Sequence, residues 1–383
     1  MIRMLTAYTR EIDDIEVAVA EIMEQLQCGD RLCRHAVGIL AFHPDFLETG
    51  AVKAISDALP FASIGGTTSA VAVPGSMGDL MLSVTVLTSD DVRFVAGASA
   101  PIASDPLAPV RDLYARLVPS LLEKPSLLLT IAPVIKHVGG DDFVRAIDMV
   151  SGGVPLFGSL AFTHLLDLSG IETWGDGERH TDALTLVALF GEVNPEFHLT
   201  TIPDERTIHQ KATITKAEKN QIQSINGMTP LNYLESIGLA QNGHVTALPA
   251  IPFVLTLSDG SQVVRTVYST TEEGAILAFG DTPQGSVVGF ADVDADFVIK
   301  TTSETIAGTI AVKAENILVF SCAGRRWTLG VRTEGEIEKI VQHFDKLCSF
   351  MFAYSGGEIC PVRNRQGDLV NRFHNFSMIS CML

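Results

Sequence analysis

An order of segments that occurs three times along the chain most strongly limits its fold. The first copy begins with AVGILAFHP at 36–44, a continuous apolar segment that ends in a turn. The second begins with SLLLTIAPV at 126–134, and the third with NILVFSCAG at 316–324. A continuous apolar strand followed by a one-faced helix indicates a sheet that is covered by helices.

The segments that follow each opening strand also agree. In the third copy, EGEIEKIVQHFDKL at 334–347 places apolar residues on one side of a helix, and DDFVRAIDMVSG at 141–152 does the same in the second. Two further strand-like segments follow each helix, with small residues after the first of them. The sequence therefore predicts an α/β fold of mixed sheets covered by helices, built from a recurring strand-helix-strand-strand unit.

The chain between the second and third copies has a different pattern of apolar and polar residues. Residues 207–226 alternate as a hairpin does, and residues 253–299 contain short alternating runs separated by Gly, Pro and Asp. A short helix is expected after Thr229, with Pro230 at its first position, and another in TTSETIAGTIAVKA at 301–314, opened by Thr302 or Ser303. A chain of 383 residues exceeds what one core usually holds, so we predict two packed halves, residues 25–200 and residues 201–383.

Charge and hydropathy limit the classes of function. The formal net charge is −18, which argues against a nucleic-acid surface because phosphate contacts need clustered Lys and Arg. No apolar run reaches the roughly 18–20 residues of a membrane span, and the first residues lack the pattern of a signal peptide. We therefore expect a cytoplasmic protein without nucleic-acid or membrane contacts. Its six Cys residues are expected to be buried thiols.

Several short motifs now point to a family. IGGTTSA at 64–70 and LFGSLA at 156–161 resemble the N-terminal part of the FIST sensory domain. Its C-terminal part is similar to NYLESIGLA at 232–240, VFSCAGRRWTLG at 319–330, the GEI that ends at Ile359, and FHNFS at 373–377. The resemblance covers roughly residues 25–383, which assigns residues 25–200 to the FIST N-terminal domain and residues 201–383 to the FIST C-terminal domain.

The resemblance implies a cytosolic sensory module of the stand-alone bacterial type that binds a small ligand such as an amino acid. FIST domains are often attached to, or encoded beside, histidine kinases, chemotaxis receptors or cyclic-dinucleotide enzymes. Because the sequence ends at Leu383 without an output domain, signalling is expected to require a separate partner of one of these kinds. Some stand-alone members are haem proteins that sense nitric oxide, and this is the first alternative.

The candidate ligand site lies where strands end. Gly65, Gly66 and Thr67 follow one strand, Cys322 and Arg325 follow another, and Glu358 follows a third. The guanidinium of Arg325 suits a ligand carboxylate, and Glu358 could accept from a ligand ammonium, so the two could hold both ends of a zwitterion. Alternatively, Arg325 pairs with Glu358 or Glu334 and only ties two loops together.

Other residues leave alternatives open. His374 and Asn375 are either polar groups of the pocket or capping groups of a turn. If haem binds, it is non-covalent because no CxxCH site exists, and His180 is the expected ligand. We otherwise expect no metal. The chain contains no GxSxG, HExxH or GxxxxGK[ST] motif, so no enzyme activity and no catalytic residue are expected. A second alternative is a ligand-free adaptor.

Overall fold

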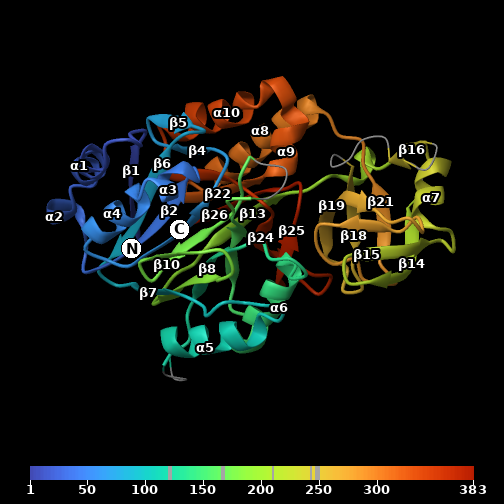
Figure 1. Ribbon diagram of the computed structural model, residues 1–383, viewed down its shortest axis with the longest axis horizontal. Coiled ribbons are helices and arrows are strands. Elements are labelled where there is room, and N and C mark those ends of the chain that lie inside the picture. Colours follow the sequence, from blue (N-terminus) through green and yellow to red (C-terminus); the bar gives the residue numbers. More distant parts are fainter. Residues whose placement is uncertain (120–122, 165–168, 209–210, 242–243, 246–250) are drawn as a thin grey trace.

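Three six-stranded mixed sheets and a closed six-stranded barrel make up the fold (Figure 1). A computed structural model describes residues 1–119, 123–164, 169–208, 211–241, 244–245 and 251–383. In Figure 1 the three sheets and most helices form one large body, and the barrel lies at one end of its long axis. The predicted α/β fold of mixed sheets covered by helices is confirmed.

The spatial order of the strands in each sheet differs from their order in the chain. Sheet one contains, from edge to edge, β1 (Arg3–Thr9), β6 (Leu82–Ser89), β2 (His35–Phe42), β3 (Ser63–Thr67), β10 (Thr173–Gly175) and β11 (Glu178–His180). Sheet two contains β25 (Leu369–His374), β24 (Glu358–Arg363), β9 (Leu156–Leu160), β8 (Leu127–Ala132), β12 (Thr185–Phe190) and β7 (Arg93–Ala98). Sheet three contains β13 (Glu196–Thr200), β26 (Met378–Met382), β22 (Asn316–Cys322), β23 (Ser349–Ser355), β4 (Val71–Val73) and β5 (Ser76–Gly78).

The recurring unit is present in all three sheets. In each, the first strand of the unit pairs in parallel with the second and antiparallel with the last: β2 with β3 and β6, β8 with β9 and β12, β22 with β23 and β26. One or two helices connect the parallel pair in each unit, which is the usual form of such a crossover. The predicted repeat is therefore a real structural repeat.

Between its second and last strands, each unit sends a hairpin into a different sheet. The hairpin β4–β5 joins β23 in sheet three, β10–β11 joins β3 in sheet one, and β24–β25 joins β9 in sheet two. No sheet is thus made by one unit alone. Because β24–β25 is in sheet two while β13 is in sheet three, strands from both sides of residue 200 share sheets, and the boundary at 200/201 stays a prediction.

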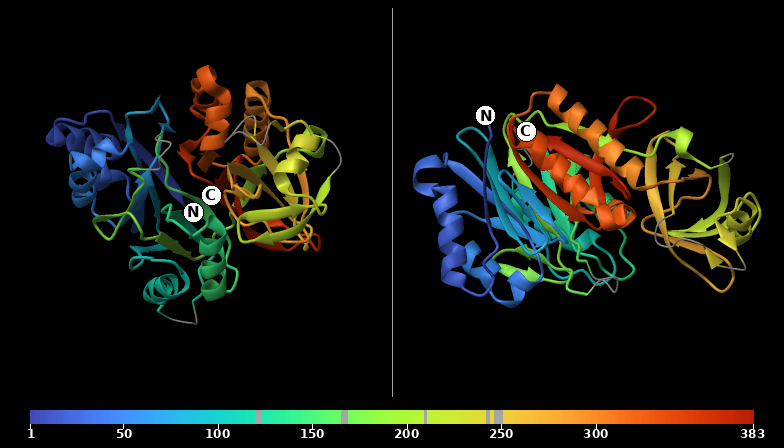
Figure 2. Two further views of the ribbon diagram at one scale, coloured as in Figure 1. Left: turned by 45° about the vertical axis from the view of Figure 1, so that its right-hand side comes forward. Right: turned by 90° about the horizontal axis from the view of Figure 1, so that it is seen from above.

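Helices cover the outer face of each sheet, and the two views of Figure 2 show them around the body. Apolar side chains of α1 and α4 pack on sheet one, those of α5 and α6 on sheet two, and those of α8 and α10 on sheet three. A separate apolar cluster fills the centre, where the inner faces of the three sheets meet. The helices are α1 (Ile15–Leu26), α2 (Cys28–Arg31), α3 (Asp45–Glu48), α4 (Ala51–Ala58), α5 (Leu107–Leu117), α6 (Gly140–Ser151), α7 (Pro230–Ser236), α8 (Ala295–Ala311), α9 (Ala323–Leu329) and α10 (Glu334–Phe344), with short 3-10 turns at Asp204–Arg206 and Gly330–Arg332.

The barrel is formed by the segment between the second and third units. Its strands are β14 (Ala212–Glu218), β15 (Gln221–Ile225), β20 (Ile276–Ala278), β19 (Gln262–Thr270), β18 (Pro252–Thr256) and β21 (Val287–Phe290), with a small pair β16 (Ala240–Gln241) and β17 (His244–Val245) beside it. Alternate residues of these strands fill its interior with apolar side chains. The barrel therefore has its own core.

Two helix starts test the predictions made from capping residues. Helix α7 begins at Pro230 with Thr229 as N-cap residue, as predicted. Helix α8 begins at Ala295, where the Asp294 carboxylate accepts from the Phe297 amide, so the predicted start at Thr302 or Ser303 is wrong. The hydroxyls of those two residues instead donate to carbonyls one turn back, within the helix.

In the described part of the chain, no helix has both the length and the apolar character needed to span a membrane.

Candidate functional site

The candidate site is centred on Glu358, the first residue of β24. Its cross-strand partners are Ser159 on β9 and His374 on β25. Partners in an antiparallel pair project to the same face of a sheet, so the side chains of Glu358 and His374 stand beside each other. Both have an exposed fraction of 0%. Two ionisable side chains without solvent contact therefore lie next to each other at the end of sheet two.

Three neighbouring segments meet at the Glu358 carboxyl group. The Ser355 hydroxyl donates to Oε1 and the Ser377 hydroxyl to Oε2, each at 2.5 Å. The Ser377 carbonyl accepts from the Cys322 amide at 2.9 Å, which brings the end of β22 to the same place. Burial raises the pKa of Glu358 to about 8, although the serine hydroxyls and the charge of Arg325 oppose this. At neutral pH the carboxyl group is therefore mostly protonated.

On the cross-strand neighbour of Glu358 and on the residue after it, two side-chain acceptor atoms have no hydrogen-bond partner among the residues that the structure describes. The imidazole Nε2 of His374 is 3.4 Å from the Cys360 carbonyl oxygen, while Nδ1 has no hydrogen-bond partner in the described part of the chain. The side-chain oxygen of Asn375, which is 2% exposed, also has none. Burial, with the charges of Arg265 and Arg372, lowers the pKa of His374 to about 3. The imidazole is therefore neutral, and an Nε2–H that donates to Cys360 leaves Nδ1 as an acceptor.

The repeat indicates that the fold does not require a carboxyl group here. The residue that pairs with Ser159 in sheet two corresponds by register to Thr173, which pairs with Gly66 in sheet one, and to Val71, which pairs with Ala353 in sheet three. A hydroxyl and an apolar side chain thus occupy the two equivalent places. Glu358 is an exception to the repeat, and a buried carboxyl group with a strongly perturbed pKa is a candidate for a functional residue.

The structure directs Arg325 away from Glu358. Its guanidinium contacts the Glu336 carboxylate, with Nη2 at 2.7 Å, and both side chains are buried. The remaining donors reach Thr301, Thr302 and the Val298 carbonyl on α8. The predicted pairing of Arg325 with Glu358 or Glu334 is wrong, because the first turn of α9 turns this side chain toward α8 and α10. Arg325 influences Glu358 only at longer range.

The glycines of β3 are explained by packing of the sheet. A Cβ on Gly65 would lie 2.6 Å from the Leu40 carbonyl oxygen, and one on Gly66 would lie 2.7 Å from Ile131 Cγ2. The Thr67 hydroxyl is used by the backbone of Glu172. The packing of the sheets thus explains why positions 65 and 66 are glycines, and the hydroxyl of Thr67 already has a partner within the protein. Ligand contact by Gly65, Gly66 and Thr67 stays a prediction.

Cys322 and His180 have distinct environments. Burial, with the nearby Glu358, raises the pKa of the Cys322 thiol well above its usual value, so it is not a reactive thiolate. His180, at the end of the hairpin β10–β11, has its Nε2 3.1 Å from the Gly175 carbonyl oxygen, and its role as haem ligand stays a prediction. Within the described ranges, no group of three or more His, Cys, Asp or Glu side chains is placed to hold a metal ion.

The structure thus brings Cys322, Glu358, His374 and Asn375 together and separates Arg325 from them. It also adds Ser355 and Ser377, which the sequence did not single out as site residues. Both stand inside the motifs of the third unit, directly before the Gly-Gly pair and at the end of FHNFS. Their position inside these motifs was the sequence signal that could have identified them as site residues.

The start of α9 adjoins the site, because Cys322 is the N-cap residue of this helix. Arg326 donates to the Ser69 carbonyl at 2.5 Å and to the exposed Asp79 carboxylate at 2.7 Å. Next to it, the half-buried Trp327 ring meets Phe162 edge to face, with ring centroids 5.7 Å apart. We call Arg326, Trp327, Phe162 and Asp79 the rim.

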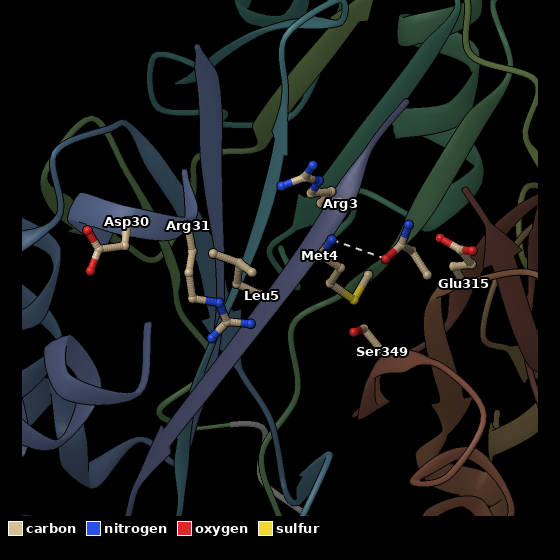
Figure 3. Close-up of a pocket in the computed structure, with 8 residues that line it drawn as sticks. Arg3, Met4, Leu5, Asp30, Arg31, Glu315 and Ser349 are labelled. Atoms are coloured by element: carbon tan, nitrogen blue, oxygen red, sulfur yellow. Dashed lines mark hydrogen bonds between the residues drawn. The ribbon is translucent and has the colours of Figure 1, made fainter. Parts of the chain in front are cut away.

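Two surface hollows lie elsewhere. One of about 420 Å³, shown in Figure 3, is lined by Arg3, Met4, Leu5, Asp30, Arg31, Glu315, Asn316 and Ser349. Its buried amide, Asn316, accepts from Met4 N at 3.1 Å and donates to the Ile2 carbonyl, so it ties β1 to β22. The other, of about 800 Å³, lies between α8 and α10. Neither is lined by a predicted site residue.

Comparison with known proteins agrees with this architecture. The family model described as the FIST N domain matches residues 36–228, and the model described as the FIST C domain matches residues 231–361. No curated protein matches the chain in sequence. The N-domain match ends within the barrel segment, whereas Glu358 lies near the end of the C-domain match. The chain belongs to the FIST family, whose domains are recognised as sensory domains that bind small ligands.

Proposed function

We propose that this protein is a cytosolic sensor whose ligand is a small molecule with a protonated amine, such as an amino acid, held by Glu358, His374 and Asn375. The observation that carries the proposal is the pair of unused acceptors on consecutive residues, His374 Nδ1 and Asn375 Oδ1, of which His374 is the cross-strand neighbour of the buried Glu358. Buried polar atoms without a partner are rare in folded proteins and are costly unless something satisfies them.

The chemistry of this set favours a donor-rich ligand. A protonated amine offers three N–H donors, and the site offers one carboxylate oxygen, one imidazole nitrogen and one amide oxygen. The carboxylate of an amino-acid ligand would need a different partner, because the donors of Arg325 are directed to Glu336 and α8. Of the two residues predicted to hold a zwitterionic ligand, we therefore propose Glu358, and not Arg325, as a ligand-binding residue.

Ligand binding is coupled to proton release in this scheme. Glu358 without ligand is mostly protonated at neutral pH, because burial raises its pKa to about 8. An ammonium group beside it favours the ionised form, so binding drives off the carboxyl proton. Affinity is thus expected to increase as pH rises from 6 to 8.

We further propose that the protein acts by binding and not by catalysis. The Cys322 sulfur is a buried thiol, and in the described part of the chain the one hydrogen-bond contact of the neutral His374 imidazole is the Cys360 carbonyl, which is not a nucleophile. Ligand entry displaces the rim, and a separate histidine kinase, chemotaxis receptor or cyclic-dinucleotide enzyme would read the altered surface. A ligand can shift such an equilibrium only by its difference in affinity for the two states.

A thermal-shift screen tests the proposal. Purified protein at pH 8 is melted with each of the twenty amino acids, small aliphatic amines and small carboxylates without an amine. A compound at 100 times its Kd raises the free energy of unfolding by about 2.7 kcal/mol, so at least one amine-bearing compound should raise Tm by several degrees. Amine-free carboxylates should not.

Matched variants connect a positive result to the site. Glu358→Gln removes the carboxylate and should abolish the shift, whereas Glu338→Gln removes an exposed carboxylate on α10 and should retain it. A shift that survives in Glu358→Gln would refute this site. No shift with any amine would favour the ligand-free adaptor, and a Soret band in the purified protein would favour the haem alternative.

A further inference from the structure

A single arginine of the barrel contacts both the large body and the backbone of the candidate site. Arg265 lies on β19, and its side chain is almost completely buried. Its Nη2 is 2.9 and 3.0 Å from the two carboxylate oxygens of Asp141, in the first turn of α6, and its Nε donates to the Asp281 carbonyl at 3.0 Å. Its Nη1 donates to the Phe373 carbonyl at 2.7 Å, one residue before His374.

The neighbouring barrel residue holds the other side of His374. The Asn375 amide donates to the Val264 carbonyl at 3.1 Å. Two consecutive residues of β19 thus hold the backbone on both sides of His374, and the guanidinium also lies 5.6 Å from the centre of the Phe373 ring. The corner Phe373–Asn375 is therefore fixed from the barrel side. Its orientation determines where Nδ1 of His374 and Oδ1 of Asn375 point.

Other contacts also join the barrel to the body, among them the packing of Val254 and Val264 against Phe376. Arg145 on α6 pairs with Asp281 of the barrel at 2.6 Å, and Arg372 pairs with Asp259. Breaking the Arg145 contact loosens the barrel attachment but removes no bond to β25. This difference makes Arg145 a matched control for Arg265.

We propose that Arg265 is a positioning residue for the candidate site: by holding the Phe373 carbonyl against β19, it aims the two unused acceptors of His374 and Asn375 at the ligand. The attachment of the barrel and the occupancy of the site are then coupled, because both depend on the same corner. This inference rests on the proposed function for its biological meaning. The positioning itself is a property of the free protein.

Nuclear magnetic resonance of the full chain tests it without a ligand. The ring nitrogens of His374 are observed after labelling all histidines with ¹⁵N and assigning His374 by its loss in His374→Gln. Exchange of the Asn375 amide hydrogen is followed in the same samples. Arg265→Gln should change the His374 ring shifts and speed Asn375 exchange roughly tenfold, the change expected from losing a hydrogen bond to a charged group.

Two further variants separate positioning from general support of the fold. Arg265→Lys keeps the charge and replaces the guanidinium donors by those of an ammonium group, and it should restore the His374 shifts at least in part. Arg145→Gln, the matched control, should leave both readouts as in the wild type. If Arg265→Gln does not fold, Arg265→Lys and Asp141→Asn are measured in its place. Each of them should speed exchange of the Asn375 amide hydrogen more than Arg145→Gln does.

Two results would overturn the inference. One is an unchanged His374 spectrum in a folded Arg265→Gln protein, and the other is an equal effect of Arg145→Gln, which would mean general loosening of the barrel. Failure of the proposed function looks different. If no amine stabilises the protein while Arg265→Gln still alters His374 selectively, Arg265 positions the corner but the corner does not bind amines.

Discussion

Arg325 Nη2 lies 2.7 Å from Glu336 Oε1, and both side chains are inaccessible to solvent. Glu336 also accepts from Ser321 at the end of β22 and from Thr302 on α8. The pair therefore joins α8, α9, α10 and sheet three at one point. Its arrangement indicates that Arg325 supports the fold behind the candidate site, and ligand contact by Arg325 stays a prediction.

Removing one partner of this pair should be strongly destabilising. Arg325→Met leaves a buried carboxylate without its counter-ion, and we expect a loss of about 3–5 kcal/mol in the free energy of unfolding, measured by urea denaturation. The double variant Arg325→Met with Glu336→Leu should recover much of that loss, because no buried charge remains. As a control, Lys53→Met breaks an exposed pair with Asp57 and should cost no more than about 0.5 kcal/mol. Equal stability of Arg325→Met and wild type would contradict this role.

The raised pKa of Glu358 should appear in the pH dependence of stability. The folded carboxyl group keeps its proton up to about pH 8, whereas the unfolded one loses it near its ordinary value of 4.5. Between these values the unfolded state binds fewer protons, so the Glu358 contribution to stability decreases as pH rises. Urea denaturation at pH 5, 6, 7 and 8 should therefore give a flatter profile for Glu358→Gln than for wild type. Profiles of equal slope would mean that Glu358 is ionised in the folded protein.

The lowered pKa of His374 should make the folded protein less stable as pH falls. Burial lowers its pKa to about 3, whereas the unfolded side chain takes up a proton near 6.5. Between these values the unfolded state binds more protons, so this contribution to stability is lost as pH falls. His374→Gln should make the protein less sensitive to pH between 6.5 and 4, as measured by Tm in the same buffers. An unchanged sensitivity would indicate that His374 is charged in the folded state.

Tryptophan fluorescence should report displacement of the rim. The chain has two Trp residues, and only Trp327 belongs to the rim, because Trp174 is on β10 of sheet one and is buried among the apolar side chains of α1 and α4. An amine that raises Tm should also change the emission of the wild type. Trp174→Phe should retain that change and Trp327→Phe should lose it. If the emission change persists in Trp327→Phe and disappears in Trp174→Phe, the ligand acts on another part of the molecule.

Close packing of the sheets should make one glycine of the second unit irreplaceable. A Cβ on Gly158 of β9 would lie 1.9 Å from the Thr130 carbonyl oxygen, a backbone atom that a side-chain rotation cannot move. Gly158→Ala should therefore destabilise the protein by at least about 1–3 kcal/mol in urea denaturation. Gly29→Ala meets nothing within 4 Å and should leave stability unchanged or slightly raised. Comparable stability of the two variants would contradict the close approach of β8 and β9.

The sequence by itself determined the repeated unit and the segments that contain the site. Apolar periodicity is a local property, so strands such as β2, β8 and β22 and the helices beside them could be read from neighbouring residues. The same reasoning singled out Cys322, Glu358 and His374; in the structure Cys322 ends β22, and Glu358 begins β24 opposite His374, the last residue of β25. Capping residues predicted helix starts less reliably. Thr302 and Asp294 are both residue types that cap helices, and only the packing of α8 shows that Asp294 is the N-cap residue.

Only the tertiary structure decided which segments meet. The exchange of hairpins between sheets, the closure of the barrel and the choice of Glu336 as partner of Arg325 all depend on contacts between residues far apart in the chain. Periodicity fixes which face of a strand is apolar, but several neighbours can cover that face or satisfy the same donor. The competition among them is resolved by the packing of the whole core, and a local pattern carries no information about its outcome.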